Sequence, residues 1–158
     1  MSRFRLMALV VLCFVGLSQG APGADAGPLP PPAPGQARVW FLRGSISPNP
    51  AVQGFSPIVY VNGAPVGPMP QGNYFYRDFA PGTYQFTVQP FGLPTGQNTT
   101  LQLPPGSVTF LNIDWVASWT QGYPPASWNF NPNTFSINEM NPQVALAYIP
   151  TMTYLGPR

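Results

Sequence analysis

The fold is decided between Ile58 and Val88, where the chain reads Ile58-Val59-Tyr60-Val61, then Tyr74-Phe75-Tyr76-Arg77-Asp78-Phe79, then Thr83-Tyr84-Gln85-Phe86-Thr87-Val88. The third segment alternates apolar and polar residues, which is typical of a half-buried β-strand. Asn62-Gly63 predicts a type I′ turn, because both residues tolerate positive φ. Pro81-Gly82 predicts a type II turn.

Further strand segments flank this stretch. Residues 38–43 form one, with an arginine at each end, and residues 99–103, 108–115 and 134–138 form three more. The 23 prolines and 16 glycines fall between these segments, at turns such as Pro104-Pro105-Gly106 and in Pro-rich loops such as residues 120–133. About seven short strands predict an all-β fold, an antiparallel β-sandwich with one core.

A small outer-membrane barrel is the alternative architecture. Its strands need roughly 9 to 11 residues to cross a bilayer, and the segments here are shorter and crowded by prolines, so we favour the sandwich. After the last strand, Asn141-Pro142 predicts an N-cap followed by proline at the first helical position. We expect a short C-terminal helix over residues 143–148, which Pro150 ends.

Charged residues make up only 6% of the chain, whereas 44% of its residues are hydrophobic, a composition that favours a folded protein. There is no lysine. Beyond residue 20 the charges balance: Arg38, Arg43, Arg77 and Arg158 against Asp25, Asp78, Asp114 and Glu139. Without a basic patch to neutralise phosphates, the sequence argues against nucleic-acid binding.

Residues 1–20 resemble a secretory signal peptide. Arg3 and Arg5 precede an apolar run over residues 6–17, and small residues follow it. We expect cleavage before Ala21, with a second candidate site after Ala26. The run is shorter than the about 20 residues that span a bilayer, so we expect export with no transmembrane span after cleavage.

Cys13 is the only cysteine, and it lies inside the apolar run of the leader. Bacterial lipid attachment needs a small residue directly before the cysteine, whereas Leu12 stands there, so we expect no lipid anchor. The chain beyond residue 20 then has no disulfide and no thiolate metal site. We divide the chain into a signal peptide (1–20), a Pro/Ala/Gly-rich tether (21–36), a β-sandwich domain (37–149) and a C-terminal tail (150–158).

The strand and turn motifs resemble a known family. They are Ala37-Arg38-Val39-Trp40-Phe41-Leu42-Arg43, Ser56-Pro57-Ile58-Val59-Tyr60-Val61-Asn62-Gly63, Val66-Gly67, Gly72-Asn73-Tyr74-Phe75 and Ala80-Pro81-Gly82-Thr83-Tyr84. In order and spacing they are similar, over residues 37–115, to the bacterial family called domain of unknown function 2846. The resemblance implies an exported envelope protein or lipoprotein with a β-sandwich akin to transthyretin-like and PEGA modules, and it supplies no catalytic site. We therefore expect the sandwich to be immunoglobulin- or transthyretin-like.

The sequence offers little catalytic chemistry. With no histidine and no cysteine outside the leader, the common nucleophile–base pairs and most transition-metal sites are excluded. Asp78, Asp114 and Glu139 remain for acid–base work, and no acidic triplet has calcium-loop spacing. A hydrolase built on Asp114 and Glu139 needs the two carboxylates roughly 5 to 10 Å apart. We expect instead that Asp114 faces outward and that Glu139 is solvated, so we predict no catalytic residues, no metal and no cofactor.

The aromatic residues carry the remaining functional signal. Most should pack in the core, but Trp119, Tyr123 and Trp128 fall in a predicted loop, where they could form a flat platform for a sugar ring or an apolar partner. We therefore expect a non-catalytic β-sandwich module of the bacterial cell envelope, periplasmic or at the cell surface, with a structural or protein-interaction role. A carbohydrate-binding module that uses these three residues on a cell-wall glycan is the alternative.

Overall fold

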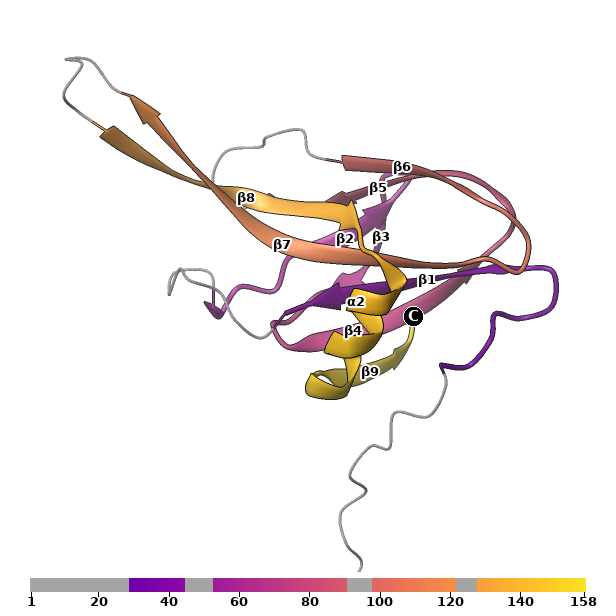
Figure 1. The fold of residues 1–158 in the computed structure, drawn as a ribbon. Coiled ribbons are helices and arrows are strands. Elements are labelled where there is room, and N and C mark those ends of the chain that lie inside the picture. Colours follow the sequence, from indigo (N-terminus) through magenta and orange to yellow (C-terminus); the bar gives the residue numbers. More distant parts are fainter. Residues whose placement is uncertain (1–28, 45–52, 91–97, 122–127) are drawn as a thin grey trace, which may run out of the picture.

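The computed structural model describes residues 29–44, 53–90, 98–121 and 128–158, with the side chains of 117–121 and 128–134 left out (Figure 1). These residues form nine strands, a short α-helix and a 3-10 turn: β1 (Ala37–Arg43), β2 (Ile58–Val61), β3 (Ala64–Pro68), β4 (Asn73–Phe79), β5 (Gly82–Val88), β6 (Asn98–Leu103), β7 (Val108–Gln121), β8 (Trp128–Glu139), α2 (Pro142–Tyr148), η1 (Ile149–Thr151) and β9 (Thr153–Pro157). The chain is mostly β, as predicted.

The strands form two sheets that pack face to face, which makes the fold sandwich-like (Figure 1). The small sheet has the order β3-β2-β5-β6 and is antiparallel throughout. The large sheet has the order β8-β7-β1-β4-β9 and is mixed, because β1 runs parallel to β7 and β4 runs parallel to β9. The prediction of antiparallel pairing throughout was therefore wrong for the large sheet, and nine strands replace the expected seven.

The two additional strands are β3 and β9. β3 reads Ala-Pro-Val-Gly-Pro, which indicates a loop by composition, but it lies at the edge of the small sheet, where proline costs little pairing. Asn62 and Gly63 join it to β2 with φ angles of 49° and 79°, the positive values that a type I′ turn requires. β9 lies at an edge of the large sheet, within residues 150–158 that we had set apart as a tail.

The Pro81-Gly82 link has a different role from the one predicted. It joins β4 of the large sheet to β5 of the small sheet, so it connects the two layers instead of closing a hairpin. Gly82 has φ 159°, close to extended backbone and far from the ~80° of a type II turn. The type II prediction was therefore wrong, and the reason is that β4 pairs with β1.

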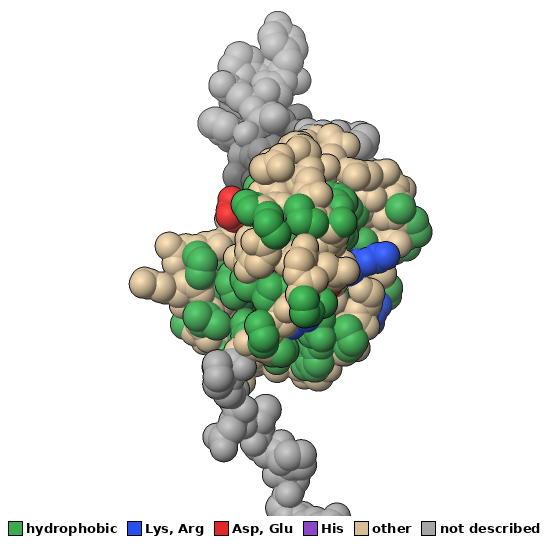
Figure 2. Space-filling view, turned by 90° about the vertical axis from the view of Figure 1, so that its right-hand side faces the viewer, with side chains coloured by type: hydrophobic (Ala, Val, Ile, Leu, Met, Phe, Trp, Pro, Cys, Tyr) green, Lys and Arg blue, Asp and Glu red, His purple; other side chains and the backbone are tan. Residues whose placement is uncertain are grey.

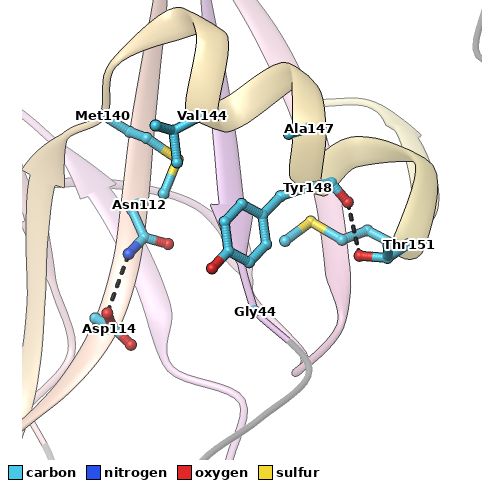
Figure 3. A pocket seen from close by; sticks show the side chains of 9 residues that line it. Gly44, Asn112, Asp114, Met140, Val144, Ala147, Tyr148 and Thr151 are labelled. Carbon is cyan, nitrogen blue, oxygen red and sulfur yellow. Dashed lines mark hydrogen bonds between the residues drawn. The ribbon is translucent and has the colours of Figure 1, made fainter.

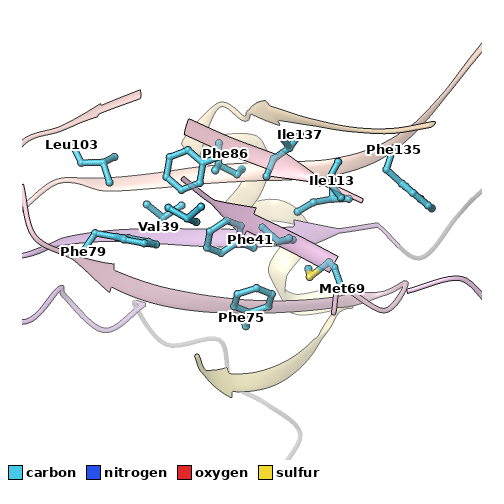
Figure 4. Close-up of a cluster of buried hydrophobic side chains, with 14 of the residues drawn as sticks. Val39, Phe41, Met69, Phe75, Phe79, Phe86, Leu103, Ile113, Phe135 and Ile137 are labelled. Atoms are coloured by element: carbon cyan, nitrogen blue, oxygen red, sulfur yellow. The ribbon is translucent and has the colours of Figure 1, made fainter. Parts of the chain in front are cut away.

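The core lies between the sheets and is rich in phenylalanine (Figure 4). Phe41 of β1 stacks on Phe75 of β4 with ring centroids 4.9 Å apart. The ring centroid of Phe86, on β5, lies 6.0 Å from that of Phe41. Alternation along β5 matches the prediction, because Phe86 and Val88 are buried while Thr83 and Gln85 are exposed.

The outer face of the large sheet carries a second, smaller cluster. Trp40, Leu42 and Phe110 are buried there beneath Ala145 of α2 and Ile149 of η1. β1 is consequently buried on both faces, which explains why all seven of its residues, the two arginines included, are buried. The helix begins as predicted, with the Asn141 side chain accepting a hydrogen bond from the backbone N–H of Gln143.

Part of the segment that we predicted as a tether lies against the domain. Arg38 donates from Nη1 to the carbonyl oxygen of Pro30 at 2.7 Å, and the N–H of Ala33 donates to Asp78 at 3.3 Å. Leu29 packs against the outer cluster. Residues 1–20 and the first part of the 21–36 segment lie outside the described residues, and no helix in the described part of the chain has the length and apolar character needed to cross a membrane.

β7 and β8 are longer than predicted. β1 pairs with β7 only as far as Asn112, so beyond that residue β7 pairs with β8, and the two continue past the sandwich as a two-stranded ribbon (Figure 1). The loop predicted over residues 120–133 was therefore wrong at both ends, because β7 continues to Gln121 and β8 begins at Trp128. Pro132 is accommodated because β8 is an edge strand and the register shifts there, with Val116 opposite Thr134 and Ser118 opposite Asn131.

Candidate functional site

Two of the three aromatic residues predicted as a ligand platform, Trp119 and Trp128, fall on the β7–β8 ribbon. Trp119 is paired with Phe130, and Trp128 is paired with Gln121, so both tryptophans occupy strand positions and not a loop. Tyr123 lies outside the described residues, as do the side chains of both tryptophans. Their use as a sugar platform stays a prediction.

The structure separates the two carboxylates of the hydrolase hypothesis. Glu139 is paired with Leu111, whose side chain belongs to the core between the sheets. Asp114 alternates with Ile113 and Trp115, which face that core, so Asp114 projects from the opposite face of the large sheet. Both residues are exposed, as predicted. Carboxylates on opposite faces of one sheet cannot flank the same scissile bond.

Asp78 has a structural role, as the ion-pair partner of Arg38. It accepts from Arg38 through both carboxylate oxygens, at 2.6 Å and 2.8 Å, and this pairing holds the pKa of Asp78 below its ordinary value. Its neighbour Arg77 makes no ion pair with it, as the alternation of a strand predicts. Among the described residues, no group of three or more His, Cys, Asp or Glu could hold a metal ion.

A cluster of aromatic rings lies beside this ion pair on the outer face, where Arg38 contacts the Tyr76 ring. Trp40 lies 4.8 Å from Tyr76 and 5.8 Å from Tyr74, and Tyr154 of β9 contacts all three rings. Burial raises the pKa of Tyr154, and the hydroxyl of Tyr76 raises it further. These rings fasten β9 to the sheet, which is a packing role.

A groove lies on the outer face of the large sheet, where α2 and η1 cross it. Its volume is about 570 Å³, a size typical of ligand sites. Its lining combines β7, the end of β1, and the C-terminal helical segment: Gly44, Asn112, Asp114, Met140, Val144, Ala147, Tyr148, Thr151 and Met152. Figure 3 shows Asn112 and Asp114 along β7 on one side, facing Val144 and Tyr148 of α2 on the other.

The described lining of the groove is mostly apolar, and Asp114 is its one charged residue. Val144 and Tyr148, one helical turn apart, are 45% and 49% exposed. The Tyr148 carbonyl oxygen accepts a hydrogen bond from the Thr151 hydroxyl at 2.7 Å, which ties the helix to η1 (Figure 3). Asn112 donates from Nδ2 to Asp114 at 3.2 Å.

Sequence reasoning had singled out Asp114 but missed the helical wall opposite it. A signal was present, because residues 142–148 read Pro-Gln-Val-Ala-Leu-Ala-Tyr, apolar around nearly the whole helix. A helix of this kind on a protein surface cannot bury every side chain. Ala145 is buried, whereas Leu146 remains 49% exposed on the side away from the groove.

Comparison with known proteins agrees with the motifs of the strands. The model of the family described as a protein of unknown function, DUF2846, matches residues 33–123, from the segment before β1 to just after β7. No curated protein matches the chain. Because the match spans more than half of the sequence, the chain belongs to the DUF2846 family.

Proposed function

We propose that this protein is an exported, non-catalytic β-sandwich module of the bacterial cell envelope, periplasmic or at the cell surface, which binds a protein partner through α2. The observation that carries the proposal is the helix itself. Val144, Leu146 and Tyr148 are each about half exposed, at 45%, 49% and 49%, on a helix that has no charged residue. Exposed apolar side chains grouped on one element favour an interaction surface.

The scarcity of charge supports the same proposal. Figure 2, which views the molecule from the right-hand side of Figure 1, shows apolar and uncharged polar side chains over most of that face, with few charged ones. The separation of Asp114 from Glu139 removes the pair that a hydrolase needs, and the leader motif supports export.

A crosslinking experiment on intact cells tests the proposal. The tagged chain is compared with a variant carrying Val144→Ser, Leu146→Ser and Tyr148→Ser, and proteins and glycans are identified by mass spectrometry. Val108→Ser is the matched control, because Val108 is 41% exposed but lies on β7, outside the groove. We expect one protein partner that the control retains and the α2 variant loses. Equal capture by all three proteins would reject the proposal.

Export is tested separately by fractionation and by the mass of the recovered chain. A protein recovered outside the cytoplasm with a mature terminus at Ala21 is expected. Recovery of the uncleaved chain in the cytoplasm would reject the envelope assignment, whatever α2 binds.

A carbohydrate-binding module is the second candidate. The observation that favours it is that Trp119 and Trp128 are paired residues of β7 and β8, the two strands that continue past the sandwich as a ribbon (Figure 1). Stacking on tryptophan is a common way to hold a sugar ring. Trp119→Ala and Trp128→Ala are expected to leave the thermal midpoint nearly unchanged and to abolish retention on a cell-wall glycan. Unchanged retention of both variants would reject this candidate.

We also propose the finer fold assignment, a sandwich related to immunoglobulin- or transthyretin-like modules. The face-to-face sheets and the antiparallel small sheet support it. The test is a strand-by-strand superposition of an experimental structure on such modules, and a different strand order in the small sheet would reject the assignment.

A further inference from the structure

We propose that the groove between α2 and β7 binds an extended, apolar segment of a partner protein that carries one lysine or arginine, and that this cation pairs with Asp114. The inference rests on the proposed function and specifies the partner's chemistry. It joins three observations on the described residues: an apolar wall, an opposing carboxylate and the lack of any cation in the lining.

The apolar wall indicates that most of the ligand's contact surface is apolar. Met140, Val144 and Ala147 present hydrocarbon, and the Tyr148 ring projects from α2 toward the Asn112 side of β7 (Figure 3). Burying such surface stabilises a complex in proportion to the apolar area removed from water. A small free amine would leave most of this wall uncovered, whereas a peptide segment covers it along its length.

The Asp114 carboxylate indicates that the ligand carries a positive charge. The one hydrogen bond of Asp114 within the described residues is the bond from the neutral Asn112 amide, at 3.2 Å, and it makes no ion pair there. Arg43 projects from the other face of the sheet, where its guanidinium donates to the carbonyl oxygens of Phe55 and Met69 and lies over the Phe135 ring. Asp114 and Arg43 still attract each other electrostatically through the sheet, but no described residue of the groove lining is a cation, so a cationic side chain in the groove complements the carboxylate.

Asn112 and α2 hold the geometry of the site. The Nδ2 bond of Asn112 orients the Asp114 carboxylate along β7, and the bond from Thr151 to the Tyr148 carbonyl fixes the end of the helix opposite (Figure 3). Groups held in this way lose little conformational entropy when a ligand binds.

Two probe peptides test the inference on the purified, isotope-labelled protein by nuclear magnetic resonance. One is N-acetyl-Gly-Leu-Val-Lys-Val-Leu-Gly-amide, and the other has norleucine, of similar shape but uncharged, in place of lysine. We expect the backbone amides of Asn112, Val144 and Tyr148 to shift with both peptides. The lysine peptide should bind about fivefold more tightly, the effect of one ion pair near a surface.

Matched variants separate charge from shape. Asp114→Asn should equalise the two dissociation constants, whereas Glu139→Gln, an exposed carboxylate on the opposite face of the same sheet, should retain the fivefold preference. Val144→Ser should weaken both peptides, whereas Leu146→Ser, equally exposed but outside the groove, should leave both unchanged. n-Butylammonium at the same concentration should not displace the lysine peptide.

Three results would overturn the inference: equal affinity of the two peptides for the unmodified protein, a preference that survives Asp114→Asn, or amide shifts confined to other surfaces. If the cellular partner is still lost on altering α2, the proposed function stands and only the cation is wrong. If the peptides behave as expected while the α2 variant captures the cellular partner normally, the groove binds but the proposed function fails.

Discussion

Arg38 and Asp78 form a two-bond ion pair on the outer face of the large sheet, with Nε to Oδ1 at 2.6 Å and Nη2 to Oδ2 at 2.8 Å. They lie opposite each other on β1 and β4, and their side chains are only 6% and 18% exposed. Arg38 also stacks over the Tyr76 ring, with its Cζ 3.7 Å from the ring centroid. The pair thus joins the segment before β1 to the centre of the sheet.

Asp78→Asn is expected to lower the free energy of unfolding by about 2 to 3 kcal/mol, because it leaves a nearly buried guanidinium without its counter-charge. Denaturation with urea measures the change. Glu139→Gln is the control, since Glu139 is exposed and makes no ion pair among the described residues, and it should change stability by less than about 0.5 kcal/mol. Equal effects of the two variants would contradict this account of the pair.

The same pair predicts an acid dependence of stability. The hydrogen bonds from Arg38, with a smaller contribution from the Ala33 N–H, hold the pKa of Asp78 below its ordinary value of 3.8. A carboxyl with a lowered pKa in the folded state stabilises the protein above its unfolded-state pKa, and this stability is lost as the pH falls toward the folded-state pKa. Unfolding measured from pH 7 downward should therefore show a loss below about pH 4 that Asp78→Asn reduces. A parallel pH dependence of the two proteins would refute it.

Phe41 is the centre of the core, and Phe41→Ala is expected to cost about 3 to 5 kcal/mol because it opens a cavity among fully buried rings. Its side chain is 0% exposed and contacts Phe75 and Phe86. Leu146→Ala, at a half-exposed helix position, should cost less than about 0.5 kcal/mol. Chevron or urea analysis of both variants checks the contrast, and a small loss in Phe41→Ala would mean that the core can close around the gap.

The strands with clear apolar periodicity could be predicted from the sequence, whereas their partners could not. β1, β2, β4, β5 and β6 lie within a residue or so of their predicted positions, because alternation and turn residues are local signals. Pairing of Trp40 with Phe110 joins residues far apart in the chain, and no local pattern encodes it. The parallel pairs of the large sheet were missed for that reason.

Prolines led to a wrong prediction of loop in two strands, β3 and the first part of β8, for the same reason. Pro65 and Pro68 in β3, and Pro132 in β8, remove backbone donors, which indicates loops unless the strand lies at a sheet edge. Edge position is a property of the assembled sheet. The groove was half predictable: an acidic residue in an apolar strand drew attention to Asp114, but only the docking of α2 brings Val144 and Tyr148 to face it.

Gly63 tests the turn that joins β2 to β3. It has φ 79°, and an added Cβ would meet nothing within 4 Å, so Gly63→Ala isolates the strain of a left-handed backbone, about 1 kcal/mol. Gly54→Ala is the matched control, because its Cβ also meets nothing and its φ is not in the left-handed region. Urea denaturation should show the loss in the first variant alone. The same loss in both would mean that the strain does not come from the positive φ.

Asn141 tests the helix that carries the groove. Its side-chain oxygen accepts from the Gln143 N–H at 2.9 Å, and its carbonyl oxygen accepts from the Ala145 N–H at 3.0 Å. Asn141→Ala removes the first of these bonds and should destabilise α2 by about 1 kcal/mol, whereas Asn141→Asp and Asn141→Ser keep an acceptor and should stay close to the original protein.

Because α2 is short and lies on the surface, the loss should appear as faster hydrogen exchange at Ala145 and Tyr148, with little change in the core strands. The lysine peptide should bind more weakly to Asn141→Ala in the same proportion, because only the folded helix forms the groove wall. Unchanged exchange in α2 would show that packing of Ala145 and Ile149 on Trp40 holds the helix without its cap.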